Sequence, residues 1–419
     1  MSGPSEVENQ DIFSEIAAAA ESLDHIRDTY FPANPDDKTS RLQKEADLAL
    51  KLLDSIPLEQ RRSSSRRATF EFLRGKMLNV FSDYRKEAED HLSKAVKLNP
   101  SLADAWLSLG DCLWKKGDLT AAKNVLCLAL EKCPNKKIYC QLSMLERKMA
   151  QDSYDQVQLV DESVEHAKEA VSCDVKDGYS WYNLGNAWLT RYFVTGAWDQ
   201  KILLEVLKAY VHAEKDESMK SNPDLYYNCA TVNKFLQNYE RALSGFEAAT
   251  LKDPGLNASE QVQHIVNLLD RIESSMNSHT NTKRLAAAGS SLVEFKLNTL
   301  QRATVSCLHE GSNRAGVVVG KVLLFIQHDD APPLCYLVCD ADQICFILSV
   351  YGLKSDAIKV GDQVTLVGPH YQSVDFSWKA KRYSFKSVRV DLMEQILVNG
   401  KALPPHLSVQ PYFLSQHRP

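Results

Sequence analysis

The sequence of 419 residues lacks any apolar run close to the roughly 20 residues that a membrane-spanning helix needs. Its first ten residues are polar and acidic, so we do not expect a secretory signal. Without one, the 10 cysteines are expected to be reduced thiols. No two of them form a Cys-x-x-Cys pair, and Cys335, Cys339 and Cys345 lie on strand-like segments without histidine partners. We therefore expect no metal site.

Motifs of catalysis are missing as well. No nucleophile with a paired base stands out, the eleven histidines are scattered, and Gly316 and Gly320 lack the Lys-Ser/Thr that follows a phosphate-binding loop. We expect a protein that is not an enzyme and that has no catalytic residues and no cofactor. The net charge of −5 argues against a chain coated for nucleic acid, although it leaves room for a local basic patch.

The clearest pattern in the chain lies between Ser101 and Pro134. Large, small and turn-forming residues follow one another at fixed offsets, namely Trp106, Leu109, Gly110, Gly117, Ala122, Leu126, Ala129 and Pro134. This is the tetratricopeptide pattern of about 34 residues, in which small residues let two antiparallel helices cross closely and the proline ends the second helix. Because one such hairpin cannot bury its own apolar face, the pattern predicts neighbouring repeats on both sides.

Related repeats do flank this segment. One precedes it at Gly75, Ala88 and Pro100, and a degraded one follows it, in which Leu142 and Ser143 replace Leu-Gly. Two more repeats follow, beginning near residues 180 and 222. We expect a disordered N-terminus (residues 1–10), capping helices (11–60), a right-handed helical solenoid (61–276), whose last helix caps it, and a polar linker (277–291).

Beyond the linker the apolar period changes from helical to alternating, which is typical of strands. Five strands are predicted at residues 315–327, 334–339, 343–351, 363–367 and 382–390, with a short helix at 354–358. This order predicts a small OB-fold barrel over residues 292–403, followed by a disordered tail (404–419). The expected fold class is multidomain α + β, an all-α tetratricopeptide solenoid followed by an all-β barrel.

The chain resembles the tetratricopeptide repeat protein five (Strap) family, in which a tetratricopeptide solenoid precedes a single OB-fold. The similarity covers nearly the whole chain apart from its extreme termini. It is carried by short strings at residues 94–100, 114–118, 142–144, 180–186, 221–225, 320–322, 383–390 and 398–401. It implies two activities for members: ribosome-associated recognition of the N-terminus of nascent tubulin, which triggers decay of tubulin messenger RNA, and scaffolding of a histone acetyltransferase coactivator in stress transcription.

The repeat register predicts which residues line the concave groove, because the first helix of each repeat faces it through positions two, five, nine and twelve. For the second to fifth repeats these positions hold Asp104, Leu107, Asp111 and Trp114; Lys137, Cys140, Met144 and Arg147; Tyr179, Tyr182, Asn186 and Leu189; and Asp224, Tyr227, Thr231 and Lys234. The predicted groove is therefore aromatic, with Arg147 and Asp224 in neighbouring parts of it.

Tubulin chains begin Met-Arg-Glu, so Arg147 is expected to pair with the glutamate of the peptide and Asp224 with its arginine, while Asn186 holds peptide backbone. The resemblance points to Arg147 and Asp224 as well. Its further acidic contact is not matched, because Ala258 occupies that position and Glu260 follows two residues later. The alternative is that both charges are solvated or stabilise the degraded repeat.

Two basic features allow contact with nucleic acid. Lys94, Lys97, Lys115 and Lys116 crowd the first repeats and are expected to face ribosomal RNA, although solvated helix faces explain them equally well. Aromatic and basic residues alternate over 376–389, as in single-strand binders, but a half-buried strand is the favoured interpretation. The basic serine cluster at 61–67 is interpreted as a helix start more readily than as a kinase site at Ser64.

The leading functional interpretation is an adaptor for tubulin surveillance at the ribosome, acting with proteins of messenger RNA decay. The second is a nuclear transcription cofactor that binds coactivator proteins, with the OB-fold contacting protein or DNA. A carboxylate clamp for C-terminal tails is disfavoured, because the groove lacks the expected Lys/Asn/Arg set. We expect a cytoplasmic and nuclear protein with no membrane partner.

Overall fold

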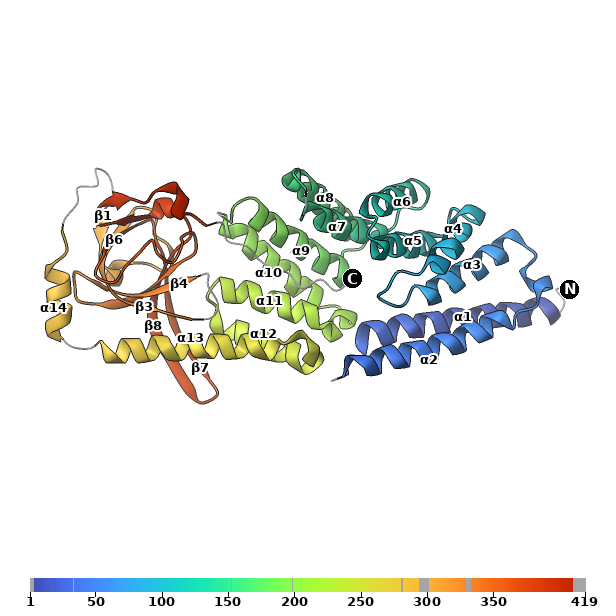
Figure 1. Cartoon of the computed structure of the whole chain (residues 1–419), viewed down its shortest axis with the longest axis horizontal. Coiled ribbons are helices and arrows are strands. Elements are labelled where there is room, and N and C mark those ends of the chain that lie inside the picture. Colours follow the sequence, from blue (N-terminus) through green and yellow to red (C-terminus); the bar gives the residue numbers. More distant parts are fainter. Residues whose placement is uncertain are drawn as a thin grey trace.

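The structure is a computed structural model that describes residues 4–32, 34–151, 153–197, 199–279, 282–293, 301–328 and 333–409. A row of helices forms the longer part of the molecule, and a curled sheet forms the end opposite the N-terminus (Figure 1). Among the described residues, no helix has the length and apolarity that crossing a membrane requires. The predicted order of an α-helical solenoid followed by a β-domain is confirmed.

The helical part begins with an antiparallel pair that packs against the first repeat. The helices are α1 (Pro4–Thr29), α2 (Pro35–Asp54), α3 (Ser64–Leu78), α4 (Lys86–Leu98), α5 (Ala103–Lys116), α6 (Leu119–Lys132), α7 (Lys136–Ala150), α8 (Gln156–Cys173), α9 (Gly178–Val194), α10 (Gln200–Glu214), α11 (Pro223–Phe235), α12 (Tyr239–Lys252), α13 (Ala258–Ser278) and α14 (Thr282–Ser290). Each predicted repeat is a hairpin of two consecutive helices, from α3–α4 to α11–α12.

Small residues set how closely the paired helices approach. A Cβ atom added to Gly110 of α5 would lie 2.8 Å from a methyl carbon of Leu126 in α6, so only glycine fits at this crossing. In the degraded repeat, Ser143 takes the glycine position, and its hydroxyl lies 3.0 Å from that of Ser163 in α8. The degraded repeat has therefore exchanged an apolar crossing for a polar one.

Two expected disordered or linker segments contain helix. Helix α1 begins at Pro4, inside the stretch 1–10 that was expected to be disordered; proline suits a first helical turn because its missing N–H has no partner there anyway. Helix α14 occupies most of the expected linker 277–291 and packs on the sheet, where the thiol of Cys339 lies 4.0 Å from the carbonyl oxygen of Leu285. Of the expected tail, residues 405–407 form a 3₁₀ turn, and residues 410–419 lie outside the described ones.

The sheet curls into a partly open barrel. Its strands are β1 (Gln301–Ala303), β2 (Gly311–Ser312), β3 (Gly316–Ile326), β4 (Leu334–Asp340), β5 (Cys345–Val350), β6 (Gln363–Val367), β7 (His370–Trp378), β8 (Lys381–Val390), β9 (Ile396–Val398) and β10 (Lys401–Ala402). The sheet order is β10-β9-β6-β3-β4-β5-β8-β7-β2, and β1 pairs with β3. The antiparallel run β6-β3-β4-β5 and the parallel pair β5–β8 give the five-strand connectivity of an OB-fold.

The five predicted strands correspond to β3, β4, β5, β6 and β8, whereas β7 was missed as a separate strand. The predicted helix at 354–358 is wrong, since these residues form turns. The chain is held extended just before them, because Leu353 bridges to Ser408 and the amide of Lys354 donates to the carbonyl of Leu407. Between this extended segment and the next buried residues the chain has room for only one turn, and one turn is too short to form a helix.

The last helices of the solenoid pack on the barrel. Buried side chains of α12 and α13 share one apolar cluster with residues of β3, β4, β5, β7 and β8. The guanidinium of Arg389 in β8 lies 4.5 Å from the ring centre of Phe235 at the end of α11 and 3.9 Å from that of Tyr351. The predicted last helix, α13, thus caps the repeats but is itself covered by the sheet.

Candidate peptide-binding groove

Three inner helices, α7, α9 and α11, carry the residues predicted for the groove. Each begins at an Asn or Asp whose side chain accepts a hydrogen bond from the first turn: Asn135 for α7, Asp177 for α9 and Asn222 for α11. Such caps supply acceptors for amides that have no partner within the helix. Because each cap fixes where its helix begins, it also fixes which residues face the groove.

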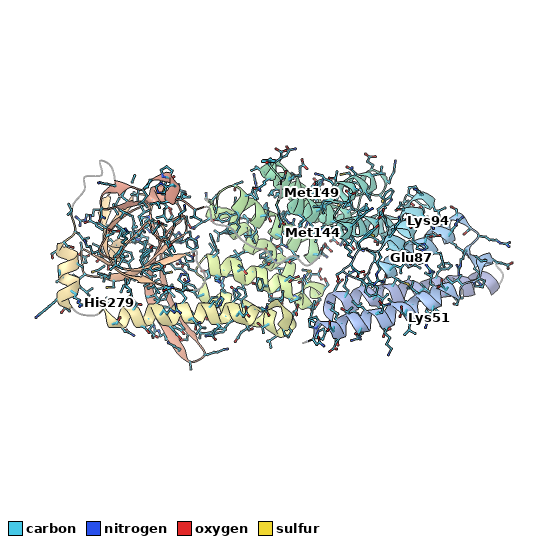
Figure 2. The ribbon with its side chains drawn as sticks, viewed as in Figure 1. Lys51, Glu87, Lys94, Met144, Met149 and His279 are labelled. Atoms are coloured by element: carbon cyan, nitrogen blue, oxygen red, sulfur yellow. The ribbon has the colours of Figure 1, made fainter. Side chains whose placement is uncertain are left out.

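An aromatic surface lies between α7 and α9. The hydroxyl of Tyr179 donates to the sulfur of Met144 at 3.2 Å, and the ring of Tyr179 lies 6.4 Å from that of Tyr182. Tyr182 in turn lies 6.1 Å from Tyr210 of α10. Met144 is near the middle of the row of helices, whereas Lys94 is near its N-terminal end (Figure 2). The register prediction for Met144, Tyr179 and Tyr182 therefore brings together residues that do contact one another.

Arg147 lies at the bottom of this surface and is buried, with 4% of its surface exposed. One terminal nitrogen donates to the Ser143 hydroxyl at 2.7 Å and to Ser163 at 3.2 Å, and the other donates to Oδ1 of Asn183 at 2.9 Å. Among the described residues no carboxylate forms an ion pair with it. Burial lowers the pKa of Arg147 to about 10. The alternative of a solvated arginine therefore does not hold for Arg147, whose contacts with Ser143 and Ser163 lie within the degraded repeat, and its role in gripping a peptide stays a prediction.

Buried polar atoms without hydrogen-bond partners occur in this guanidinium, in its partner Asn183 and in Asn228, which contacts Tyr182. They are Nε of Arg147, Nδ2 of Asn183 and Oδ1 of Asn228. A buried polar group without a partner costs about 1–3 kcal/mol, and a buried charge without a counter-ion costs more. Two donors beside an uncompensated cation suit the carboxylate of a ligand, and the amide oxygen of Asn228 suits an N–H of peptide backbone.

Asp224 lies close enough to Tyr182 to affect the pKa of its hydroxyl. It lies in the first turn of α11 and is half-buried. Burial raises the pKa of Tyr182, and the next largest contribution comes from the negative charge of Asp224. The positive charge of Arg147 acts on the same pKa in the opposite direction. The two charges predicted from the register therefore both act on Tyr182.

Three other predicted groove residues have different surroundings. Asn186 is 1% exposed, and its Oδ1 accepts from the Tyr210 hydroxyl at 2.7 Å and from Asn228 at 3.3 Å, so it is not available to hold a peptide backbone. Trp114 packs against the N-terminal apolar cluster, and Tyr227 packs edge-on against Phe246 of α12 at 5.2 Å. The prediction for Asn186 is wrong because its side chain is bonded within the fold, whereas Trp114 and Tyr227 are partly exposed and their place in the groove stays a prediction.

Asn183 and Asn228 were missed by the register. The sequence signal that could have identified them is an asparagine at a helical position with the spacing of buried residues, within a segment otherwise rich in aromatic and small residues.

The position of the third acidic contact holds a buried alanine, Ala258, and Glu260 is exposed in the first turn of α13. An acidic side chain is thus present near that end of the groove but points into solvent.

The four predicted basic residues do not form one patch. Lys94 and Lys97 are exposed on α4 and make no ion pair within the described part of the chain. Lys115 is 6% exposed at its side chain, bonded to the carbonyl of Asn79 at 2.7 Å and to Asp111 at 2.7 Å. Lys116 pairs with Glu89 at 3.0 Å. The prediction that Lys115 faces a partner is wrong, since its ammonium group satisfies a helix end within the fold.

The aromatic and basic residues of β7 and β8 are used mainly against the solenoid. Lys381 pairs with Asp270 at 2.6 Å and with Glu273 at 2.7 Å on α13, and the hydroxyl of Tyr383 donates to Asp270 at 2.7 Å. Lys379 pairs with Glu247 of α12 at 2.7 Å. The half-buried strand is therefore the interpretation that the contacts favour, and these cations are not free to track a nucleic-acid backbone.

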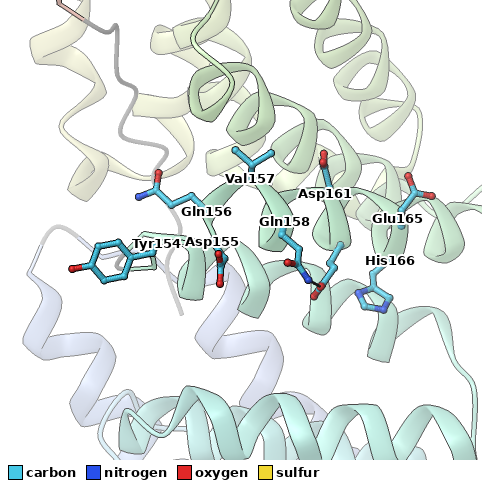
Figure 3. A pocket seen from close by; sticks show the side chains of 9 residues that line it. Tyr154, Asp155, Gln156, Val157, Gln158, Asp161, Glu165 and His166 are labelled. Atoms are coloured by element: carbon cyan, nitrogen blue, oxygen red, sulfur yellow. Dashed lines mark hydrogen bonds between the residues drawn. The ribbon is translucent and has the colours of Figure 1, made fainter.

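Two further regions lie outside the predicted groove residues, namely the basic serine cluster and a hollow beside α8. Residues 61–67 contain the start of α3, where the Ser63 hydroxyl accepts from the amide of Arg66, as a helix cap does. A hollow of about 840 Å³ lies on the outer side of α8, lined by Tyr154, Asp155, Gln156, Val157, Gln158, Asp161, Glu162, Glu165 and His166 (Figure 3). None of the predicted groove residues lines this hollow. Within the described ranges, no group of three or more His, Cys, Asp or Glu residues could hold a metal ion.

The fold and the groove together define a tetratricopeptide-repeat protein with a terminal OB-fold, a class that binds peptides and partner proteins. Two family models match the chain. The model for the Tetratricopeptide repeat protein 5 OB fold domain matches residues 299–411, and a Tetratricopeptide repeat model matches residues 103–136.

Curated relatives cover almost the whole chain. Tetratricopeptide repeat protein 5 of Homo sapiens is 36% identical over 426 residues, which is 96% of each chain, and that of Bos taurus is 36% identical over 94% of each. The chain therefore belongs to the tetratricopeptide repeat protein 5 family.

Several solved structures resemble about half of the chain. They include YrrB, described as a TPR protein with an unusual peptide-binding site (18% identity, 49% of this chain and 94% of that one, TM-score 0.34), and a thermophilic TPR protein of Thermus thermophilus (16% identity, 48% and 98%, TM-score 0.40).

Proposed function

We propose that this protein is a non-enzymatic adaptor whose groove binds the N-terminus of nascent tubulin at the ribosome and thereby promotes decay of tubulin messenger RNA. Peptide binding is supported mainly by Arg147, a buried guanidinium without a carboxylate partner in the described chain. A ligand carboxylate would supply the missing counter-ion in a dry site, where charge-assisted hydrogen bonds are strong.

The order of charges supports a peptide that carries both signs. Arg147 and Asp224 both act on the pKa of Tyr182, which lies beside Tyr179, and this suits a short apolar segment next to an arginine and a glutamate. A peptide beginning Met-Arg-Glu offers these groups in consecutive positions. The methionine side chain is unbranched and polarizable, so it suits an aromatic surface that already contains Met144.

The test is capture of ribosome–nascent-chain complexes by the full-length protein. Complexes that display Met-Arg-Glu should be retained, whereas complexes in which the glutamate is replaced by glutamine or the arginine by alanine should not. Asp224→Asn should weaken capture of the first complex. Equal capture of all three would contradict the proposal, because binding would then depend on the ribosome or on another surface.

The ribosome is proposed to contact the exposed lysines of α4. Lys94 and Lys97 project from the same face of that helix, three residues apart, and they lie in a chain of net negative charge. Such a contact releases counter-ions from RNA, so its affinity should fall steeply as salt rises. The proposed location is cytoplasmic, with a nuclear fraction.

The second candidate is a nuclear transcription cofactor that scaffolds a histone acetyltransferase coactivator. It is supported by the rigid attachment of the OB-fold to α11–α13, which presents two binding domains as one unit. Chromatin association that persists in a protein with a disabled groove would favour this role, whereas co-sedimentation with ribosomes would favour the first.

A further inference from the structure

Two cysteines of the barrel lie directly opposite each other across antiparallel strands, Cys339 on β4 and Cys345 on β5. The amide of Asp340 donates to the carbonyl of Ile344 at 3.1 Å, so the adjacent cysteine pair occupies a site without mutual backbone hydrogen bonds. In such pairs the Cα atoms are about 4.5 Å apart. That separation falls within the roughly 4.4–6.8 Å that a disulfide spans.

The two thiols differ in environment. Cys339 is fully buried beneath α14, close to the carbonyl of Leu285, whereas Cys345 is partly exposed. A hydrogen bond from the Cys339 thiol lowers the pKa of Cys345, and the same bond raises the pKa of Cys339. Cys345 is therefore the sulfur that an oxidant can reach and the one with more thiolate character, which is what controls cysteine reactivity.

We propose that Cys339 and Cys345 form an oxidant-reactive dithiol site that takes hydrogen peroxide and closes to an intramolecular disulfide. The Cys345 thiolate attacks one peroxide oxygen, the O–O bond breaks, and one water leaves after protonation, giving a sulfenic acid. The Cys339 sulfur then attacks the Cys345 sulfur, the S–O bond breaks, and the Cys339 proton leaves with the hydroxide as a second water. Two thiols lose two electrons in total, and the peroxide gains them.

A neighbouring cysteine provides an internal comparison. Cys335 lies on the same strand β4 and is also fully buried, but Ser349 occupies the opposite position on β5. Exposed cysteines such as Cys173 and Cys307 are reachable by oxidant but have no thiol across a strand in the described chain. Only the facing pair should therefore convert to a disulfide, while exposed thiols stop at sulfenic acid or proceed to sulfinic acid.

The experiment treats the full-length protein with hydrogen peroxide, blocks the remaining thiols with N-ethylmaleimide under denaturing conditions, and analyses tryptic peptides by mass spectrometry. One peptide, residues 322–354, holds Cys335, Cys339 and Cys345. It should lose two hydrogens and take up one maleimide instead of three, and dithiothreitol should restore three. Cys335→Ser should preserve the hydrogen loss, whereas Cys339→Ser should abolish it.

Retention of three maleimides after peroxide would overturn the proposal. Oxidation of Cys345 to sulfinic acid with Cys339 still alkylated would also overturn it, because it would mean that the facing thiol does not resolve the sulfenic acid. Circular dichroism of each variant, compared with the untreated protein, shows whether the barrel is folded. If Cys339→Ser unfolds, Cys339→Ala provides the same chemical test.

Discussion

Replacing Arg147 by methionine should weaken binding of a Met-Arg-Glu peptide strongly while changing the stability of the fold little. Methionine has nearly the length of the arginine stem and no charge. The pKa of Arg147 falls to about 10 on burial, and since one pKa unit corresponds to about 1.4 kcal/mol, the charged form is disfavoured in the fold by about 3 kcal/mol. This penalty is present at neutral pH and disappears only as the pH rises above 10, where the folded protein releases the proton.

The substitution also has a cost of similar size. Asn183 loses the donor to its Oδ1, and a buried acceptor without a partner costs about 1–3 kcal/mol. Ser143 and Ser163 keep their mutual contact, because the Ser163 hydroxyl also donates to the Ser143 carbonyl at 2.9 Å. Removing the penalty of the buried charge and leaving Asn183 without its donor have nearly equal and opposite effects on the free energy of unfolding. The free energy of unfolding should therefore change by less than about 2 kcal/mol.

Binding should respond very differently. Truncating one partner of a buried, hydrogen-bonded charge pair costs about 2–5 kcal/mol, which corresponds to roughly thirtyfold or more in affinity. Isothermal titration calorimetry measures the affinity, and urea unfolding followed by circular dichroism measures the stability. Arg191→Met is the matched control, because Arg191 is an exposed arginine of α9 that pairs with Asp161 at 2.9 Å. If Arg147→Met lowers the free energy of unfolding by well over about 2 kcal/mol and still binds the peptide within a factor of two, the arginine is structural and the reasoning is refuted.

Three further perturbations test other parts of the account. Lys94→Glu with Lys97→Glu should weaken ribosome co-sedimentation and flatten its salt dependence, and unchanged sedimentation would remove α4 from the contact. Gly185→Ala should lower the thermal unfolding midpoint of the solenoid, because its Cβ would lie 2.6 Å from a ring carbon of an α10 tyrosine and overpacking costs about 1–3 kcal/mol. Partial burial of Asp270 acts to raise its pKa, but hydrogen bonds, chiefly from Lys381, lower the pKa overall. The docking of the β7–β8 hairpin should therefore weaken as the pH falls below about 4 and Asp270 becomes protonated. Hydrogen exchange of that hairpin at pH 3 and pH 7 checks this, and equal protection at both would contradict it.

Much of the helical architecture follows from local rules that can be read in the sequence. Gly110, Gly185 and the Asn and Asp caps fix helix ends and crossings through contacts between residues close in sequence. The strands of the barrel are equally visible, since β7 alternates in burial and β4, β5 and β6 are short apolar runs buried on both faces. The predicted boundaries of the elements are wrong where the apolar pattern in the sequence is weakest. Helix α14 is an example, since its polar composition is typical of a linker.

The groove could be predicted only in part. The register brought Met144, Tyr179 and Tyr182 together as the contacts have them, because those contacts depend on ideal repeat geometry. It could not reveal that Arg147 is buried, since that depends on Ser143 and Ser163 of the degraded repeat making room together. Likewise, the ion pairs that attach β8 to α13 join residues more than one hundred positions apart, and no local pattern encodes them.

The most direct test of the central claim is a double-mutant cycle between Arg147 and the glutamate of the peptide. Affinities are measured for peptides beginning Met-Arg-Glu and Met-Arg-Gln, each with the wild-type protein and with Arg147→Met. The account predicts that the wild type prefers the glutamate peptide at least tenfold and that the variant binds both equally, a coupling of about 1.4 kcal/mol or more. A coupling within the measurement error, with both proteins showing the same preference, would contradict it.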